Sequence, residues 1–288
     1  MTGPARATDA DGETVSLDGR VVVVTGASSG IGEAAARSLA RAGAEVAVVG
    51  RSPERTEAVA KGCGATPFVC DFSRLEEVRQ LAASLAARYT AIDVLANNAG
   101  LFSRRRVTTT DGFELTEQVN HLAPFLLTNL LDDRLGPGSR VVTTSSRVHL
   151  YGRLGPDGAA PAGPYGGWRA YSRSKLENVL FSNELARRLA ARGATSVAFH
   201  PGSVRTGFGR RGGAVSLVYG TPIGRLVLVS PRSGADTLVW LASAPVGSGW
   251  EPGGYYFRRR PARARESARD PALAARLWER SARDVGLS

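Results

Sequence analysis

A glycine-rich loop between a buried strand and a helix limits the folds open to this chain more than any other feature. Residues 21–26 read VVVVTG, a continuous apolar run that predicts a parallel strand buried on both faces. The loop that follows has the spacing G-x-x-x-G-x-G, and residues 31–43 predict an Ala-rich helix that ends at Gly43. Glycine permits a close approach of phosphate, and a helix N-terminus offers it free N–H groups. The loop therefore predicts a dinucleotide site, with candidate cofactor-binding residues Gly26, Ser28, Ser29, Gly30, Ile31 and Gly32.

Strand-like and helix-like segments alternate along the rest of the chain. Such alternation predicts a single doubly wound α/β domain, in which a Rossmann-type parallel sheet carries helices on both faces. Neither an internal repeat nor a change in composition marks a second domain. Further strands are expected at 44–50, 66–72, 92–100, 139–146 and 195–202, and further helices at 75–89, 119–135 and 170–193.

The segments outside this alternation define the expected domain limits. We expect residues 1–17 to form a flexible N-terminal tail and residues 18–288 to form the domain. The Gly/Pro-rich segment 152–167 and residues 203–231 predict irregular structure within it.

Composition excludes several protein classes. All apolar stretches fall short of the ~20 residues that a membrane helix needs, and the polar N-terminus lacks the apolar core of a signal peptide. Cys63 and Cys70 are too few to cross-link a chain of 288 residues and indicate a reducing compartment. We therefore expect a cytoplasmic protein without a membrane partner.

The net charge of +11 raises the question of nucleic-acid binding. Only Lys61 and Lys175 are lysines among the 37 basic residues, and the bias toward Arg, Ala and Gly indicates a GC-rich, bacterial coding genome. The arginine clusters lack interleaved aromatic residues and any helix-turn-helix or zinc-finger spacing. We interpret them as solvated surface that also attracts an anionic cofactor, and expect no nucleic-acid partner. The three histidines do not have metal-ligand spacing, so we expect no metal site.

The residue after the second strand indicates the cofactor. A fold of this kind that prefers a ribose 2′-hydroxyl places Asp or Glu about 20 residues beyond the glycines. This chain has Arg51 there, which can pair with a 2′-phosphate. The sequence therefore favours NADP(H) over NAD(H), unless Arg51 is one more surface arginine.

Tyr171 and Lys175 lie four residues apart, on one face of a predicted helix. A free tyrosine has a pKa of about 10, which makes it a poor acid or base at neutral pH. A cation beside it favours the phenolate and lowers that pKa. The pair therefore predicts general acid/base chemistry.

A second reading of the glycine-rich loop stays open. Residues 26–30 spell G-A-S-S-G, which matches the nucleophile elbow of serine hydrolases with Ser28 as nucleophile and His200 or His149 as base. An elbow normally lies deeper in the chain than the first strand.

Several motifs together resemble the short-chain dehydrogenase/reductase family, over residues from about 18 to the end. Within that family the chain is most similar to the retinol dehydrogenase-like branch, through segments such as AYSRSKLENVLFSNELARRL and HPGSVRT. The motifs, in the family's order and approximate spacing, are Thr25–Gly32, Asp71-Phe72, Asn97–Gly100, Asn120, Ser145-Ser146, Tyr171–Lys175 and His200–Gly202.

The resemblance implies four catalytic residues. Tyr171 would be the general acid in reduction and the base in oxidation, and Lys175 would lower its pKa and hold the nicotinamide ribose. Ser146, rather than Ser145, would hydrogen-bond the substrate oxygen, and Asn120 would hold a proton-relay water.

The resemblance also implies cofactor contacts beyond the glycine-rich loop. Asp71 and Phe72 would flank the adenine, and Asn98, Ala99 and Gly100 would line the nucleotide cleft. Contacts to the nicotinamide end would come from Pro201, Gly202, Val204 and Thr206, with Tyr171 and Lys175.

The implied activity is the interconversion of a carbonyl and an alcohol on a hydrophobic small molecule, with a place in specialised metabolism. Residues 203–231 would form the substrate lid, and residues 215–229 within them are largely apolar. The chain departs from the branch in carrying Ala123-Pro124 in place of Gly-His, where the proline would kink the helix near Asn120, and in lacking an N-terminal anchor, which argues against membrane-dissolved retinoid. A catalytically silent nucleotide-sensing protein of the same fold is the other alternative. We also expect a homodimer or homotetramer, with Leu176–Leu189 as its seam.

Overall fold

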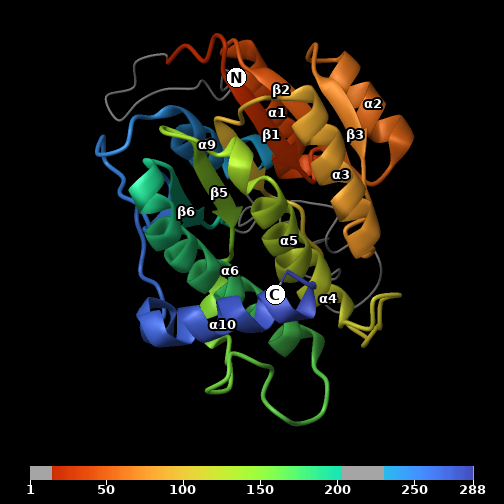
Figure 1. Ribbon diagram of the computed structural model, residues 1–288, viewed down its shortest axis with the longest axis vertical. Coiled ribbons are helices and arrows are strands. Elements are labelled where there is room, and N and C mark those ends of the chain that lie inside the picture. The colour runs from red at the N-terminus through yellow and green to blue at the C-terminus, as the bar shows by residue number, and fades with distance from the viewer. Residues whose placement is uncertain (1–14, 203–229, 288) are drawn as a thin grey trace, which may run out of the picture.

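The apolar runs of the sequence form one sheet in the computed structural model, which describes residues 15–202 and 230–287 (Figure 1). The strand order in these ranges is β3-β2-β1-β4-β5-β6-β7-β8, parallel throughout except for the antiparallel pair β7–β8. The order reverses between β1 and β4, which confirms the doubly wound fold. The strands are β1 (Val21–Thr25), β2 (Glu45–Gly50), β3 (Thr66–Val69), β4 (Val94–Asn97), β5 (Arg140–Thr144), β6 (Thr195–Phe199), β7 (Tyr255–Phe257) and β8 (Arg260–Pro261).

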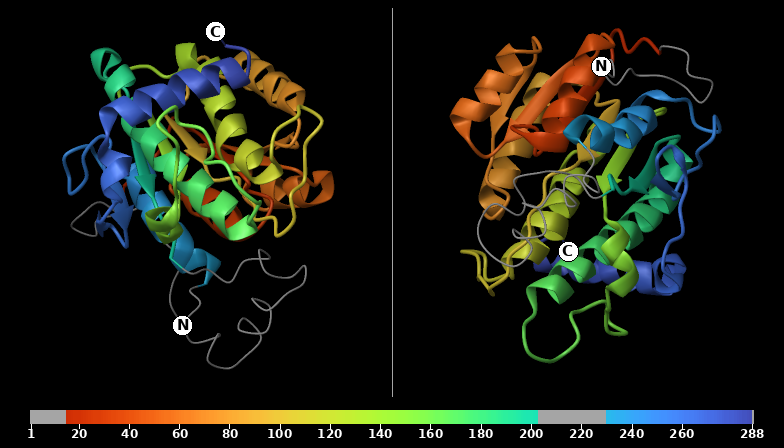
Figure 2. Two further views of the ribbon diagram at one scale, coloured as in Figure 1. Left: turned by 90° about the horizontal axis from the view of Figure 1, so that it is seen from below. Right: turned by 180° about the vertical axis from the view of Figure 1, so that it is seen from behind.

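Helices cover both faces of the sheet, as the views from opposite sides show (Figures 1 and 2). Strand β1 shows why both faces must be covered, because its apolar side chains point to both of them. Val22 and Val24 pack into the core on one face, and Val23 packs into the core on the other. The first face carries α1 (Gly30–Arg41), α2 (Pro53–Lys61) and α9 (Pro231–Ser243). The second carries α3 (Leu75–Arg88), α4 (Leu115–Glu117), α5 (Ala123–Leu130) and α6 (Gly167–Leu189).

The helix expected at 119–135 is divided in the structure. It begins earlier, with α4, continues as a single π-helical turn at Gln118–Leu122, and ends with α5 at Leu130. Pro124 has no N–H group with which to bond the C=O group of Asn120, four residues earlier. The π turn accommodates this loss, so the irregularity lies at Asn120 itself.

The oligomer seam expected on α6 is wrong, because the leucines of Leu176–Leu189 are buried within one chain. Helix α10 (Pro271–Asp284) crosses α6 (Figure 1). It contributes Leu273 and Leu277 to a core shared with Leu176 and Leu180. Apolar side chains that are already covered cannot form a second interface.

Three expectations concern the chain outside the regular elements. Residues 152–166 carry no helix or strand, as expected. Leu17 does not belong to a tail: it is 6% exposed and its N–H group donates to the C=O group of Ala42 at 2.7 Å. Residues 1–14 and most of the expected lid, 203–229, lie outside the described residues. No helix in the described ranges is long and apolar enough to span a bilayer.

Candidate active site

The glycine-rich loop turns at the carboxyl end of β1 and leads into α1. Gly26 and Gly30 have φ angles of 65° and 62°, in the left-handed region that glycine adopts readily. A Cβ atom on Gly32 would lie 2.4 Å from the carbonyl oxygen of Gly26. Ser29 is the N-cap residue of α1, and its side chain makes no capping hydrogen bond. The N–H groups of the first turn of α1 therefore remain available to a phosphate. The loop therefore fits a pyrophosphate.

Thr25 joins this loop to the segment after β4. Its Oγ1 atom accepts hydrogen bonds from the N–H groups of Asn98 at 2.9 Å and Ala99 at 3.0 Å. The Asn98 side chain donates back to the carbonyl oxygen of Thr25 at 3.0 Å. Residues 98–100 and the glycine-rich loop, both expected at the nucleotide cleft, therefore lie side by side.

The end of β2 reaches the same loop. A Cβ atom on Gly50 would lie 2.6 Å from the Cβ atom of Ser28, so this position has no room for an acidic side chain. The next residue, Arg51, is exposed, and no carboxylate of the described residues pairs with it. A cation is thus available where a 2′-phosphate was expected.

Asp71 and Phe72 follow β3, but only one of the two side chains remains near the surface. Asp71 is partly buried and accepts hydrogen bonds from the N–H and hydroxyl groups of Ser73 at 2.9 and 2.8 Å. Phe72 is 5% exposed and packs in the core with Leu75 and Val78. The Phe72 ring is therefore buried under α3, so only its backbone remains to contact an adenine at this position, and the contact expected of Asp71 and Phe72 stays a prediction.

The predicted acid/base pair lies on α6, at the carboxyl ends of β4 and β5. The Lys175 ammonium is 5.6 Å from the centre of the Tyr171 ring, and Lys175 is 3% exposed. Its Nζ atom donates to the carbonyl oxygen of Thr144 at 3.2 Å, which uses one of three N–H donors. Burial lowers the pKa of Lys175 from 10.5 to about 8, so it is still mostly charged at pH 7. A buried cation next to a phenol suits the predicted chemistry.

Asn120 lies beside Lys175 and bonds Ser174, the residue before it on α6. Its side-chain amide donates to the Leu101 carbonyl at 3.0 Å and to the Ser174 hydroxyl at 2.9 Å. Its Oδ1 atom accepts the N–H group of Leu101 at 2.7 Å. A Cβ atom on Gly100 would lie 3.2 Å from Oδ1 and 3.4 Å from Nζ of Lys175, which places these two groups around one small space.

The two adjacent serines differ in what their hydroxyl groups do. Ser145 is 2% exposed and its hydroxyl donates to the carbonyl oxygen of Lys175 at 2.7 Å. Ser146 is partly exposed, and its Oγ atom accepts the N–H group of Val148 at 3.4 Å. An accepting hydroxyl keeps its own proton for another acceptor. The geometry therefore favours Ser146 over Ser145 as donor to a substrate.

His149 holds the turn that follows Ser146, a contact the sequence does not indicate. Its Nε2 atom accepts the N–H group of Arg265 at 3.2 Å, so its Nδ1–H group donates to the Ser146 carbonyl at 2.7 Å. The Arg265 guanidinium also donates to the carbonyl of Leu150 at 2.6 Å. Burial lowers the pKa of His149, which keeps the neutral ring that these two bonds require.

The residues expected at the nicotinamide end are only partly described. Pro201 and Gly202 follow β6 and are partly exposed, and Gly202 has a φ of 83°. Its N–H group donates to Nδ1 of His200 at 3.3 Å. Val204 and Thr206 lie outside the described residues.

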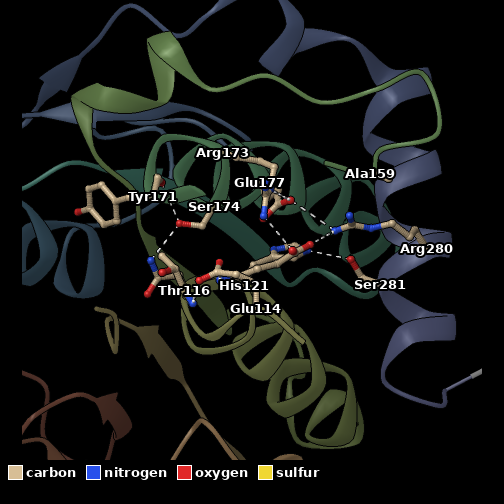
Figure 3. A network of polar contacts seen from close by, with 12 residues as sticks. Glu114, Thr116, His121, Ala159, Tyr171, Arg173, Ser174, Glu177, Arg280 and Ser281 are labelled. Atoms are coloured by element: carbon tan, nitrogen blue, oxygen red, sulfur yellow. Dashed lines mark hydrogen bonds and ion pairs between the residues drawn. The ribbon is translucent and has the colours of Figure 1, made fainter. Parts of the chain in front are cut away.

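A charged cluster occupies the other side of α6 (Figure 3). Arg173 pairs with Glu117 at 3.0 Å and with Glu177 at 3.6 Å, and Arg280 of α10 pairs with the same two carboxylates at 2.9 and 3.4 Å. Glu177 is fully buried. Burial would lower the pKa of Arg173, but Glu177 and Glu117 outweigh it and raise that pKa. The Tyr171 ring points away from this cluster (Figure 3), which separates the two groups of charges.

The serine-hydrolase reading finds no support in these contacts. In residues 15–202 and 230–287, no hydrogen bond joins Ser28 to a histidine, and no cluster of side chains could hold a metal ion. His121 bonds to Ser281 at 2.8 Å, and His149 and His200 bond to the groups named above. Each histidine is thus committed elsewhere.

Comparison with known proteins agrees with this arrangement. The family model described as "short chain dehydrogenase" matches residues 20–213. The chain is 46% identical over 277 residues to a protein of Streptomyces sp. (strain C5) provisionally named a daunorubicin C-13 ketoreductase. The match covers 94% of this chain and 94% of the relative. The chain is 38% identical over 290 residues to human retinol dehydrogenase 13, over 94% of this chain and 86% of the relative.

A solved structure supports the same conclusion. A short-chain dehydrogenase from Burkholderia cenocepacia J2315, in complex with NADP, superposes with a TM-score of 0.65 at 27% identity, over 88% of this chain and 96% of the other. The resemblance inferred from the sequence motifs, including the likeness to retinol dehydrogenases, is therefore confirmed.

Proposed function

Because the chain belongs to the short-chain dehydrogenase/reductase family, whose members are oxidoreductases acting on alcohol and carbonyl groups, we propose that it is an NADP(H)-dependent enzyme for a hydrophobic small molecule. The observation that carries this proposal is the buried Lys175 ammonium, 5.6 Å from the centre of the Tyr171 ring, with which no carboxylate of residues 15–202 and 230–287 pairs. An enzyme that must adjust the pKa of a phenol needs such a cation.

The residues on α6 and β5 divide the chemistry between them. When bound, NADPH supplies the hydride. In reduction, the Tyr171 hydroxyl donates its proton to the carbonyl oxygen as that oxygen becomes an alkoxide, and the Ser146 hydroxyl donates a hydrogen bond to the same oxygen. The Lys175 charge stabilises the phenolate that remains, and its further N–H donors suit ribose hydroxyl groups. In oxidation, the Tyr171 phenolate takes the alcohol proton back.

Preference for NADP(H) over NAD(H) is the second part of the proposal. Its support is the strand end at Gly50, which cannot accommodate an acidic side chain, followed by the exposed cation of Arg51. An acidic group there would bond a ribose hydroxyl, whereas a guanidinium pairs with a phosphate.

The substrate proposal is a hydrophobic ketone, aldehyde or secondary alcohol. The support comes from the relatives, named as a ketoreductase and a retinol dehydrogenase, and from the largely apolar residues 215–229. We favour the reductive direction and a role in specialised metabolism because the relative at 46% identity is named as a ketoreductase.

A fluorescence titration of the purified protein with NADPH and with NADH tests the cofactor proposal. We expect NADPH to bind at least tenfold more tightly, which is about 1.4 kcal/mol. Arg51→Ala should remove most of that preference and leave NADH binding unchanged. Equal affinities in the wild type would contradict the role of Arg51, and binding of neither would contradict the nucleotide site. Turnover lost in Tyr171→Phe would exclude the silent-fold alternative.

A further inference from the structure

One face of α6 presents a line of side chains that runs from the surface into the site. Trp168, Tyr171 and Lys175 are spaced by three and four residues, so they follow one another along a single face. Trp168 is 55% exposed, Tyr171 is partly buried, and Lys175 is 3% exposed. The exposed indole of Trp168 therefore lies next to the Tyr171 ring on the surface side of this line.

A second ring lies against Tyr171 from the segment after β4. Phe102 meets the Tyr171 ring edge-on, with centroids 5.8 Å apart and planes at 88°, and the Trp168 ring lies 6.5 Å from Tyr171. The residue before Phe102, Leu101, is held by two hydrogen bonds to the Asn120 side chain. The position of Phe102 is thus fixed by a residue of the candidate site.

The exposure of Trp168 needs an explanation. The chain has four tryptophans, and the structure describes all of them. Trp240 and Trp250 are each 1% exposed and Trp278 is partly buried, so Trp168 alone lies mostly in solvent. A large exposed aromatic side chain next to a reactive group is typical of a binding surface, because an indole gains most from being covered.

We propose that Trp168 and Phe102 form an aromatic platform that selects planar, fused-ring aromatic ketones over aliphatic ones of similar size. Aromatic pairs contribute to binding beyond the burial of their area, and a rigid ring system loses little conformational freedom on binding. The keto group of such a substrate lies at the edge of its ring system, where the Tyr171 and Ser146 hydroxyl groups can reach it. This inference rests on the proposed function.

The test compares two methyl ketones with the same carbon skeleton, 2-acetylnaphthalene and its saturated counterpart 2-acetyldecahydronaphthalene, with NADPH. In the wild type we expect kcat/KM to be higher for the aromatic ketone. Trp168→Leu, which keeps an apolar side chain but removes the ring, should lower kcat/KM for 2-acetylnaphthalene by about five- to tenfold, the change that one aromatic pair gives. Trp168→Phe should lower it less than threefold, and Phe102→Leu should behave as Trp168→Leu does. Activity toward 2-acetyldecahydronaphthalene should change less than twofold in all three variants. Val246→Ala, an exposed apolar residue in the loop after α9, is the surface control and should change neither.

Equal losses for both ketones in Trp168→Leu would overturn the proposal, because they would indicate space filling and not ring recognition. Unchanged kcat/KM in Trp168→Leu would overturn it as well. Equilibrium binding of 2-acetylnaphthalene to the NADP⁺ complex separates this inference from the proposed function. Binding that weakens in Trp168→Leu without turnover in the wild type would support the platform and contradict the enzyme activity.

Discussion

Arg173 and Lys175 are two cations on the same helix, two residues apart, in opposite electrostatic environments; Arg173 is partly buried and Lys175 is buried. Arg173 lies among Glu117, Glu177 and Arg280, and the two carboxylates raise its pKa. Lys175 faces the other side of α6, donates to a carbonyl group, and has its pKa lowered to about 8 by burial alone. One helix therefore carries a compensated charge and an uncompensated one.

The difference separates a charge that holds the fold from a charge kept for chemistry. Removing one partner of a buried ion pair is costly because it leaves the other charge uncompensated. In the part of the chain that the structure describes, Lys175 has no carboxylate partner, and the lowering of its pKa from 10.5 to about 8 corresponds to about 3 kcal/mol of unfavourable burial at pH 7. A fold keeps such a cost where the charge has another use, which here is the phenol of Tyr171.

The largest effect is expected on the catalytic side. Tyr171→Phe removes only the hydroxyl that transfers the proton, so kcat should fall by about 10²–10⁴. Ser146→Ala should lower kcat by about 10², because one hydrogen bond to the developing alkoxide is lost. Steady-state ketone reduction measures both, and NADPH titration should show affinities within about twofold of the wild type. Full activity in Tyr171→Phe would contradict the assignment of Tyr171, and with it Lys175, to catalysis.

On the structural side, Glu177→Gln should lower the free energy of unfolding by about 3 kcal/mol, because Arg173 and Arg280 lose their fully buried carboxylate and keep only Glu117 and the more exposed Asp284. Chemical denaturation measures the change. The folded variant should retain turnover within about threefold, since the cluster lies away from Tyr171. Glu33→Gln, which removes a half-exposed partner of Arg37 on α1, is the matched control and should cost less than about 1 kcal/mol. Equal losses in both variants would contradict the special role of the cluster.

Lys175→Met should have the opposite effect on stability. At pH 7 it removes the uncompensated charge and one hydrogen bond, so the free energy of unfolding should rise by about 2 kcal/mol while turnover is lost. Between pH 8 and 10.5 the unfolded wild type keeps a proton that the folded wild type has released, so wild-type stability gains with pH in this window. The advantage of the variant should therefore shrink as pH rises through it.

The control for that prediction is the chain's other lysine. Lys61 is exposed, and Lys61→Met should leave both stability and its pH dependence unchanged. A Lys175→Met variant that is less stable than the wild type at every pH would show that the ammonium is compensated after all.

The smallest effect is expected at Ser145, whose hydroxyl bonds the backbone of α6. Ser145→Ala should cost about 1 kcal/mol of unfolding free energy, the value of one buried hydrogen bond, and change kcat less than threefold. Thermal or chemical unfolding beside the turnover assay separates it from Ser146→Ala. A loss of turnover confined to Ser145→Ala would exchange the roles of the two serines.

Much of the fold can be predicted from the sequence because five strands, β1, β2, β4, β5 and β6, are buried on both faces. Runs such as 21–24 are apolar without interruption, and a strand of a covered parallel sheet has no polar face that could interrupt them. Strand β7 has three residues and β8 has two, too short for any pattern. The π turn depends on how the loss of one N–H group at Pro124 is accommodated, which local sequence does not determine.

In the candidate site, too, local sequence patterns predict some contacts, whereas others depend on the packing of distant segments. Tyr171 and Lys175 are four residues apart, so helical spacing alone places them together. The acceptor of Lys175, the carbonyl group of Thr144, is 31 residues away, and Arg280 is 103 residues from Glu177. In a chain so rich in arginine, nothing local distinguishes Arg280 or Arg265 from a surface residue. Only the packing of α10 and of the segment before it assigns them their partners.

The scarcity of lysine makes the central claim directly measurable. With ¹³C-labelled lysine, the cofactor-free protein should give two Cε signals in an NMR titration, and Lys61→Arg assigns the one that remains to Lys175. We predict that the Lys175 signal titrates near pH 8. A Lys175 signal that titrates at or above its ordinary value of 10.5 would contradict the claim that α6 holds one buried cation without compensation.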